Sequence, residues 1–130
     1  MIYMDASALV TLVSGRPPVT ALRTFLAGKP GMPMGTSTIG FVETVRTLDQ
    51  VGDFPGAMEM LIRTFTEILV TEDVRDAAAH LPRGLRTLDA IHVSSAQALG
   101  PALDTLVTYD KRMLDAARAL GLPAAAPGLE

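Results

Sequence analysis

The sequence predicts an α/β fold, a three-layer α/β/α sandwich with a central, mainly parallel sheet. Two observations support this prediction. Short apolar runs bounded by turn residues alternate along the chain with segments whose apolar residues recur at helical spacing. The runs are nearly continuous in apolar character, as expected for parallel strands that are buried on both faces. With 130 residues, 48% of them hydrophobic, the chain is long enough for one domain that spans 1–130 around one core.

Two strands and four helices are expected in the first half of the chain. An apolar run at 2–4 and a weaker one at 34–36 predict the strands. Clusters of Gly and Pro separate the helical stretches, and Ser37 or Thr38 is placed to cap the third helix. The expected helices are 7–14, 19–27, 38–51 and 57–65. In the last of these, the residues expected to face inward are Met58, Leu61, Ile62 and Phe65.

The second half predicts two further strands and three helices. The continuous apolar run 68–70 is typical of a buried parallel strand, and 105–108 is the clearest remaining strand. Thr87 is expected to cap the second helix of this half, and Asp110 to open the third. Residues 123–128 form either a last edge strand or a tail. The expected helices are 72–81, 88–99 and 111–120.

Composition excludes several classes of function. The chain has no cysteine, which excludes a disulfide scaffold, a thiolate metal site and a cysteine nucleophile. Because its net charge is −3, any nucleic acid must bind to a local basic patch rather than to the whole surface. No apolar stretch approaches the roughly 20 residues of a membrane span, and Asp5 interrupts the apolar start. We therefore expect no membrane anchor and no secretory signal, and a cytoplasmic protein.

Four of the fourteen acidic residues occupy unusual positions. Asp5 and Asp110 follow predicted strands, at the carboxyl ends where open α/β sheets keep their sites. Glu43 and Asp89 lie early in helices among apolar neighbours. Ordinary interpretations exist, because Asp5 and Asp110 are also suited to cap helices. Glu43 could pair with Arg46 one turn later, and Asp89 could simply favour the positive end of its helix.

The four carboxylates, if they converge, predict a cation site. Clustered negative charges repel one another, and a bound cation relieves that repulsion. Oxygen ligands in a chain with no cysteine and only two histidines suit Mg²⁺ or Mn²⁺. Such ions, alone or as a pair, can hold a phosphodiester and activate water for its hydrolysis.

Four short segments resemble the motifs of PIN-domain proteins. The opening Met1–Leu9 is a hydrophobic strand followed by Asp-x-Ser, and Thr36–Glu43 is a helix start that carries a single Glu. Leu88–Val93 and Leu106–Asp110 resemble the third and fourth motifs, and Ala116–Leu122 resembles the usual ending. The resemblance spans the whole chain, at the length typical of the VapC toxins of type II toxin–antitoxin pairs.

This resemblance implies a metal-dependent endoribonuclease with a PIN-like three-layer fold. Asp5 and Asp89 would be the principal ligands of Mg²⁺, for which Mn²⁺ could substitute, and Glu43 and Asp110 would complete the site. RNA is the implied substrate. The implied partners are a small antitoxin, whose C-terminal segment covers the site, and a second copy of the chain in a homodimer.

The chain departs from the family pattern just after the fourth acid. Many relatives carry a further acid two residues later, where this chain has Arg112, and Asp115 is the nearest substitute. The departure leaves open whether one metal ion or two are bound. It also supports an alternative from another class, a catalytically silent PIN-like module that binds RNA or a protein.

Two polar side chains close to the acids have expected supporting roles. Ser7 is placed either to bond the Asp5 carboxylate or to cap the first helix. His92 is expected to pack or to support the site from behind, because a metal-activated water needs no histidine base. A phosphatase with Asp5 as nucleophile is disfavoured, since that chemistry usually has a second acid where this chain has Ser7.

Basic residues border the third and fourth acidic motifs. They are candidates to bind RNA phosphates, which supply most of the affinity in nucleic-acid complexes. Solvated surface charge is the ordinary alternative for each of them. The candidates are Arg83, Arg86, Lys111 and Arg112.

Overall fold

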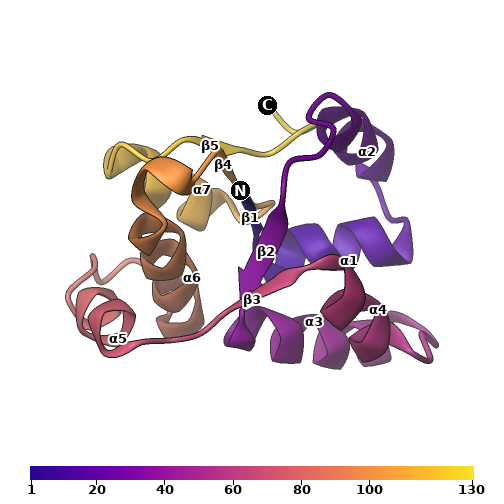
Figure 1. The fold of residues 1–130 in the computed structure, drawn as a ribbon, viewed down its shortest axis with the longest axis horizontal. Helices are drawn as coiled ribbons and strands as arrows, with labels where there is room; N and C mark the ends of the chain where they lie inside the picture. The colour runs from indigo at the N-terminus through magenta and orange to yellow at the C-terminus, as the bar shows by residue number, and fades with distance from the viewer.

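A computed structural model describes all residues from Met1 to Glu130. Five parallel strands form one sheet in the order β3-β2-β1-β4-β5, so the first strand lies at its centre (Figure 1). The predicted parallel sheet is therefore confirmed. The strands are β1 (Ile2–Met4), β2 (Met34–Ser37), β3 (Thr66–Ile68), β4 (Thr105–Val107) and β5 (Ala124–Ala125).

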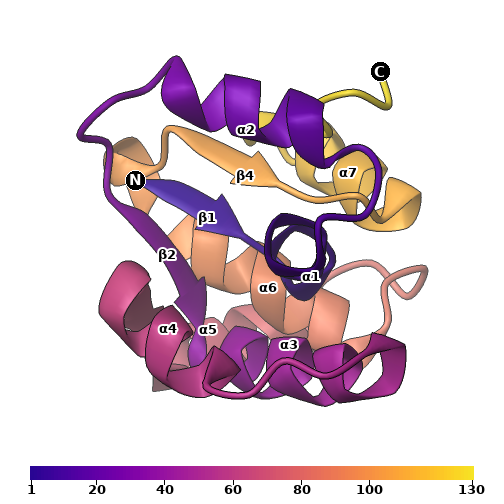
Figure 2. The same cartoon turned by 90° about the vertical axis from the view of Figure 1, so that its right-hand side faces the viewer.

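Seven α-helices cover the two faces of the sheet and complete the predicted three layers. Figure 1 shows α5 and α6 on one side of the strands and α1 and α2 on the other, and Figure 2 shows the same arrangement from the side. A short 3₁₀ helix, Gly100–Ala102, follows α6. The α-helices are α1 (Ala6–Ser14), α2 (Val19–Ala27), α3 (Thr38–Val51), α4 (Ala57–Thr64), α5 (Glu72–Ala79), α6 (Thr87–Ala98) and α7 (Lys111–Ala119).

Both faces of the central strands are buried, which explains why these strands are apolar throughout. Ile2 and Met4 of β1 pack with buried residues of α1 to α4. Tyr3 points to the opposite face and packs with Val93 of α6 and Met113 of α7. Alternate residues of β1 thus belong to different cores, as the two-residue period of a strand requires.

The prediction for the third strand is wrong in position and in burial. The strand is Thr66–Ile68 rather than 68–70, and it lies at the edge of the sheet beside β2. Leu69 and Val70, expected to be buried, are 66% and 39% exposed. An edge strand is covered less than a central one, so the apolar run continues past the sheet onto the surface instead of filling the core.

Two smaller differences concern a helix face and a helix end. Ile62, expected to face inward, is 61% exposed, because it lies about 100° around the helix from the buried Leu61. Thr87 is the first residue of α6 rather than its cap, a position taken by Arg86. Of the two alternatives for 123–128, the edge strand is confirmed, since Ala124–Ala125 form β5 at the edge of the sheet beside β4.

The start of α3 is packed tightly against β2. Ser37 caps the helix, and its Oγ accepts a hydrogen bond of 3.1 Å from the Gly40 amide. A Cβ atom at Gly40 would lie 2.0 Å from Thr36 Oγ1, so only glycine fits here. This close approach sets the position of α3 against β2, and α3 carries Glu43 one turn further along.

No helix has both the length and the apolar character needed to cross a membrane.

Candidate active site

A polar cavity of about 230 Å³ brings together all four predicted acidic residues. It lies where β1 and β4 end, and Figure 2 shows these two strands running side by side into α1 and α7. Helices α3 and α6 supply the remaining walls. Its lining includes Asp5, Ser7, Arg16, Glu43, Thr47, Arg86, Asp89, His92 and Asp110.

Asp5 is buried and held by three hydrogen bonds. Its Oδ1 accepts from Ser7 Oγ at 2.7 Å and from the Ala8 amide at 2.9 Å, and its Oδ2 accepts from Thr108 Oγ1 at 2.6 Å. Asp5 is therefore both the cap of α1 and a member of the cavity, so the two interpretations are not exclusive. Burial raises the pKa of Asp5, while the hydrogen bonds from Thr108, Ser7 and Ala8 act in the opposite direction.

Asp110 caps α7 in the same way. Its Oδ1 accepts from the amides of Arg112 and Met113 at 2.9 and 3.1 Å. The Asp110 amide donates to Thr108 Oγ1 at 3.0 Å, so Thr108 links this residue to Asp5. Ser7 bonds the carboxylate rather than capping the helix, and its Oγ also accepts from the Tyr109 amide at 2.9 Å.

Asp89, in the first turn of α6, makes no hydrogen bond within the protein, in contrast to Asp5. It is half-buried, and its pKa is raised. The largest cause is burial, followed by repulsion from Asp110 and Glu43. The carboxylates of the cavity therefore lie close enough to act on one another electrostatically.

Glu43 pairs with His92 and not with Arg46. His92 Nε2 lies 2.7 Å from Glu43 Oε1 and is itself buried, whereas the Glu43 side chain is 28% exposed. The other ring nitrogen, Nδ1, lies 2.7 Å from the hydroxyl of Tyr3. His92 is thus packed behind the site, as expected.

The donor set of the cavity fits a hard divalent cation. Each carboxylate keeps an oxygen that can still bind a cation. Asp5 Oδ2 accepts only one hydrogen bond. No hydrogen bond from the protein reaches Glu43 Oε2, Asp110 Oδ2 or either oxygen of Asp89. Oxygen ligands of this kind suit Mg²⁺ or Mn²⁺. No three acidic or histidine side chains form a ready-made ligand set, so ion binding requires rotation of the half-buried carboxylates.

Two arginines line the cavity, and neither forms an ion pair with its carboxylates. Arg86 was a sequence candidate, but Arg16 was not. The Arg16 guanidinium donates to Thr11 Oγ1 at 3.2 Å and to the Ser7 carbonyl at 3.4 Å, which directs some of its N–H groups away from the acids. Nothing in its sequence context signals this position. Thr108 was also missed, although a polar residue two positions before Asp110 was an available signal.

The other sequence candidates lie outside this cavity. Lys111 Nζ pairs with Asp115 Oδ2 at 3.1 Å, and both side chains are exposed. Arg83, Arg112 and Asp115 line a separate surface hollow between the loop after α5 and the start of α7. The structure therefore does not bring Asp115 to the other acids, and Asp110 is the last acid along the chain to line the cavity.

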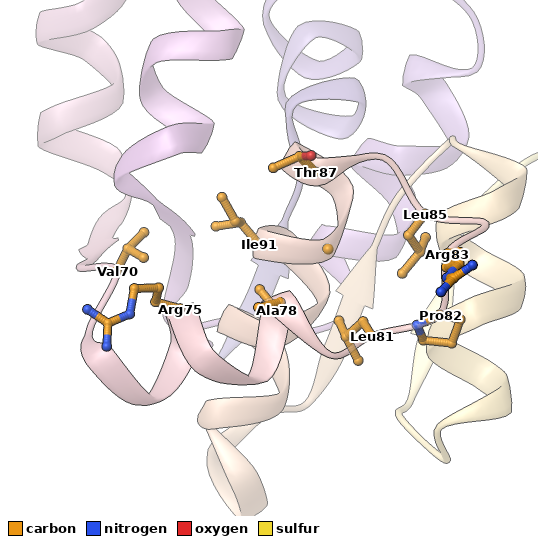
Figure 3. Close-up of a pocket in the computed structure, with 11 residues that line it drawn as sticks. Val70, Arg75, Ala78, Leu81, Pro82, Arg83, Leu85, Thr87 and Ile91 are labelled. Carbon is orange, nitrogen blue, oxygen red and sulfur yellow. The ribbon is translucent and has the colours of Figure 1, made fainter.

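A larger hollow of about 430 Å³ lies between α5 and α6, and we call it the α5–α6 groove (Figure 3). Its walls are mostly apolar and include Val70, Leu81 and Ile91. Arg75 and Arg83 are its only charged residues, and it contains no carboxylate or histidine. The groove therefore lacks the groups needed for acid–base or metal chemistry.

Comparisons with known proteins point to one family. Residues 2–119 match the PIN domain. The chain is 40% identical over 134 residues to Ribonuclease VapC47 of Mycobacterium tuberculosis (strain CDC 1551 / Oshkosh), covering 98% of both chains. It is also 40% identical over 128 residues to Ribonuclease VapC46 of Mycobacterium tuberculosis (strain ATCC 25618 / H37Rv), covering 97% of both.

Solved structures show the same fold at lower identity. One is the Mycobacterium tuberculosis toxin VapC20, described as cleaving the sarcin-ricin loop. It has a TM-score of 0.75 and 21% identity over 98% of this chain and 100% of that one. Another is a toxin–antitoxin complex from Klebsiella pneumoniae, with a TM-score of 0.73 and 22% identity over 98% of both chains. At these identities the likeness establishes the fold alone.

Proposed function

The chain belongs to the PIN-domain family, and from this premise we propose that it is a metal-dependent endoribonuclease, the toxin of a type II toxin–antitoxin pair. The observation that carries the proposal is the cavity in which four carboxylates converge, each with an oxygen that accepts at most one hydrogen bond and so can still bind an ion. The ribonuclease names of relatives at 40% identity support the same activity.

The acids divide into rigid and adjustable members. Asp5 is fixed by three hydrogen bonds and Asp110 by two, so each offers an oxygen from a set position. Asp89 has no such restraint and can rotate toward a ligand. We assign Asp5 and Asp89 as principal ligands of Mg²⁺ or Mn²⁺, with Glu43 and Asp110 completing the site. The bound cation would polarise the scissile phosphate and lower the pKa of the attacking water.

The two arginines of the cavity are suited to hold the substrate. An RNA phosphate approaching four carboxylates meets repulsion, and Arg16 and Arg86 supply positive charge beside them. Because neither is neutralised by an ion pair, both are available to bind the backbone. Arg83 and Arg112 line the hollow beyond, where a longer RNA could continue.

The proposed partners are proteins as well as RNA. We propose that a small antitoxin covers the site and that the toxin forms a homodimer in the cytoplasm. One similar structure is described as a toxin–antitoxin complex, which supports the first partner. Exposed apolar side chains such as Val42, Leu69 and Leu88 offer surface for protein contact. Light scattering coupled to gel filtration tests the homodimer, and a monomer at micromolar concentration would contradict it.

Cleavage of RNA by the purified, antitoxin-free protein tests the proposed activity. Total cellular RNA is incubated in Mg²⁺ or Mn²⁺ and the new 5′ ends are mapped, with EDTA as a control. We expect discrete, metal-dependent cuts that disappear in Asp5→Asn. Asp49→Asn is the matched control, since it removes an exposed acid outside the cavity and should leave the cuts unchanged.

Two outcomes would contradict the proposal. Cuts that persist in EDTA would exclude the metal mechanism. A folded protein that makes no cuts and takes up no Mn²⁺ in a calorimetric titration would favour the silent RNA- or protein-binding module.

A further inference from the structure

A hydrogen-bonded chain of three side chains leads from the middle of the sheet to the carboxylate cavity. The Tyr3 hydroxyl on β1 lies 2.7 Å from His92 Nδ1, and His92 Nε2 lies 2.7 Å from Glu43 Oε1. The Ser37 amide, at the start of α3, donates to the Tyr3 hydroxyl at 3.2 Å. Tyr3 and His92 are almost completely buried. We call this arrangement the Tyr3–His92–Glu43 chain.

The partners fix the direction of each hydrogen bond. An ionised carboxylate only accepts, so His92 Nε2 must carry a proton and donate it to Glu43 Oε1. The Tyr3 oxygen already accepts from the Ser37 amide, so its own hydroxyl proton is free to point at His92 Nδ1. Burial raises the pKa of Tyr3 to about 12, which keeps that proton in place at neutral pH. Every member of the chain is then satisfied in one arrangement.

We propose that Tyr3 and His92 are positioning residues that hold Glu43 by Oε1 and thereby present Oε2 to a divalent cation in the cavity. The inference rests on the proposed function, because it explains how one acid of the proposed metal site, Glu43, is held in position. Glu43 has three rotatable bonds and is partly exposed, so without an anchor it would sample many rotamers. Anchoring one oxygen from the protein interior restricts those rotamers before an ion arrives.

Stability alone does not account for the arrangement. The bond between the buried Tyr3 and His92 side chains gives little net stability by itself, because two such partners can usually be replaced by apolar groups of similar shape at little cost. The hydroxyls of Thr36 and Ser95, which also act on Tyr3 to lower its pKa, have no hydrogen-bond partner of normal geometry. A layer of buried polar groups with unsatisfied members is costly, which is typical of residues retained for a site.

Mn²⁺ affinity of the full-length protein, measured by calorimetry, tests the proposal. We expect His92→Phe to weaken Mn²⁺ binding by about 10- to 100-fold, the usual range for groups that support metal ligands. His92→Gln restores a donor near the Nε2 position and should recover part of the affinity. The matched control is Ser94→Ala on the same helix, which removes a buried hydrogen bond to the Val74 carbonyl but does not touch the chain.

Two further readouts separate positioning from a merely structural role. In RNA cleavage, His92→Phe should lower kcat and leave KM for RNA unchanged, because the arginines that face the phosphate are intact. In metal-free protein, long-range ¹H–¹⁵N spectra should show the His92 proton on Nε2. If His92→Phe fails to fold, Tyr3→Phe/His92→Phe removes both buried polar groups together and should fold with the same loss of affinity.

The outcomes distinguish this inference from the proposed function. Wild-type Mn²⁺ affinity in folded His92→Phe, with weakened binding in Glu43→Gln, would overturn the positioning role and leave the nuclease intact. Unchanged affinity in Glu43→Gln together with lost affinity in Asp89→Asn would also overturn it. A wild-type protein that neither binds Mn²⁺ nor cuts RNA would overturn both.

Discussion

Helix α6 separates two hollows of opposite character. Asp89 and His92, three residues apart, face the carboxylate cavity, whereas Ala90 and Ile91 line the α5–α6 groove (Figure 3). The groove is the larger, at about 430 Å³ against about 230 Å³, yet it has no acid and no histidine. One helix thus serves both regions through its 3.6-residue period. Residue types rather than volume indicate where chemistry takes place.

The two regions also differ in what restrains them. Side chains of the cavity are held by hydrogen bonds from distant parts of the chain, as Asp5 is by Thr108. The groove is held by apolar packing of α5 against α6 and leaves Val70 partly exposed. A change in the cavity should therefore affect activity, and a change in the groove should affect stability or partner binding.

The largest expected effect comes from two near neighbours on α6. Asp89→Asn should lower RNA cleavage by about 100-fold or more, because Asp89 is a proposed metal ligand and loss of a ligand costs at least as much as loss of a group that supports one. Ile91→Ala, two residues further on but facing the groove, should leave the rate within about 2-fold. Initial rates on one mapped RNA substrate measure both variants. Equal losses would show that the two sides of α6 are not independent.

The second effect is on stability, through the helix that forms the far wall of the groove. Val74 is the buried residue of α5, and Val74→Ala should lower the free energy of unfolding by about 1–3 kcal/mol. Cleavage at a temperature where the variant is folded should be unchanged. Urea denaturation followed by circular dichroism measures the free energy of unfolding, and the RNA assay measures the cleavage rate. A large loss of activity without unfolding would mean that α5 supports the site.

The sequence was sufficient to predict the layers of the fold and the four acids of the cavity. Strands β1, β2 and β4 were correctly located because their apolar runs are short and bounded by turn residues. Asp5 and Asp110 were recognised because the carboxyl ends of parallel strands meet at one edge of the sheet, which brings them together although they are far apart in sequence. Glu43 and Asp89 were recognised by their apolar neighbours early in helices and by the resemblance to PIN-domain motifs.

Features that depend on contacts between distant residues could not be predicted. The bond between Thr108 and Asp5 joins residues 103 positions apart, and the bond between Tyr3 and His92 joins residues 89 apart. Arg16 reaches the cavity because its side chain folds back along α1 to Thr11 Oγ1 and the Ser7 carbonyl, and no local pattern encodes that. The third strand was misplaced because apolar residues exposed beside an edge strand have the same local composition as buried ones.

The third effect is a gain in the free energy of unfolding from Asp89→Asn, the same substitution that should strongly lower cleavage. Burial and like charges raise the pKa of Asp89, so folding disfavours its ionised form. In metal-free buffer at pH 7, Asp89→Asn should therefore raise the free energy of unfolding, by up to about 1 kcal/mol because the side chain is half exposed to solvent.

The pH dependence of this gain follows from the sign of the pKa shift. As pH falls through the raised pKa, wild-type Asp89 becomes protonated in the folded protein and the penalty disappears. The gain should vanish below about pH 4, the ordinary Asp value, where both states are protonated. Thermal unfolding in EDTA between about pH 4 and pH 7 measures the difference in stability between wild type and Asp89→Asn. Asp115→Asn is a control that should show no gain. A gain that persists at low pH would mean that charge is not its cause.

The smallest effect is expected from Val70→Lys at the rim of the groove. Val70 is 39% exposed and follows an edge strand, so a lysine can extend into solvent without displacing a core residue. Stability should change by less than about 0.5 kcal/mol and RNA cleavage should not change. A charge on an apolar rim would, however, weaken any protein contact made there.

If the variant keeps its stability and cleavage but has half the wild-type molar mass in light scattering, the groove is covered by a second copy. If cleavage falls instead, the separation of chemistry and packing by α6 is incomplete.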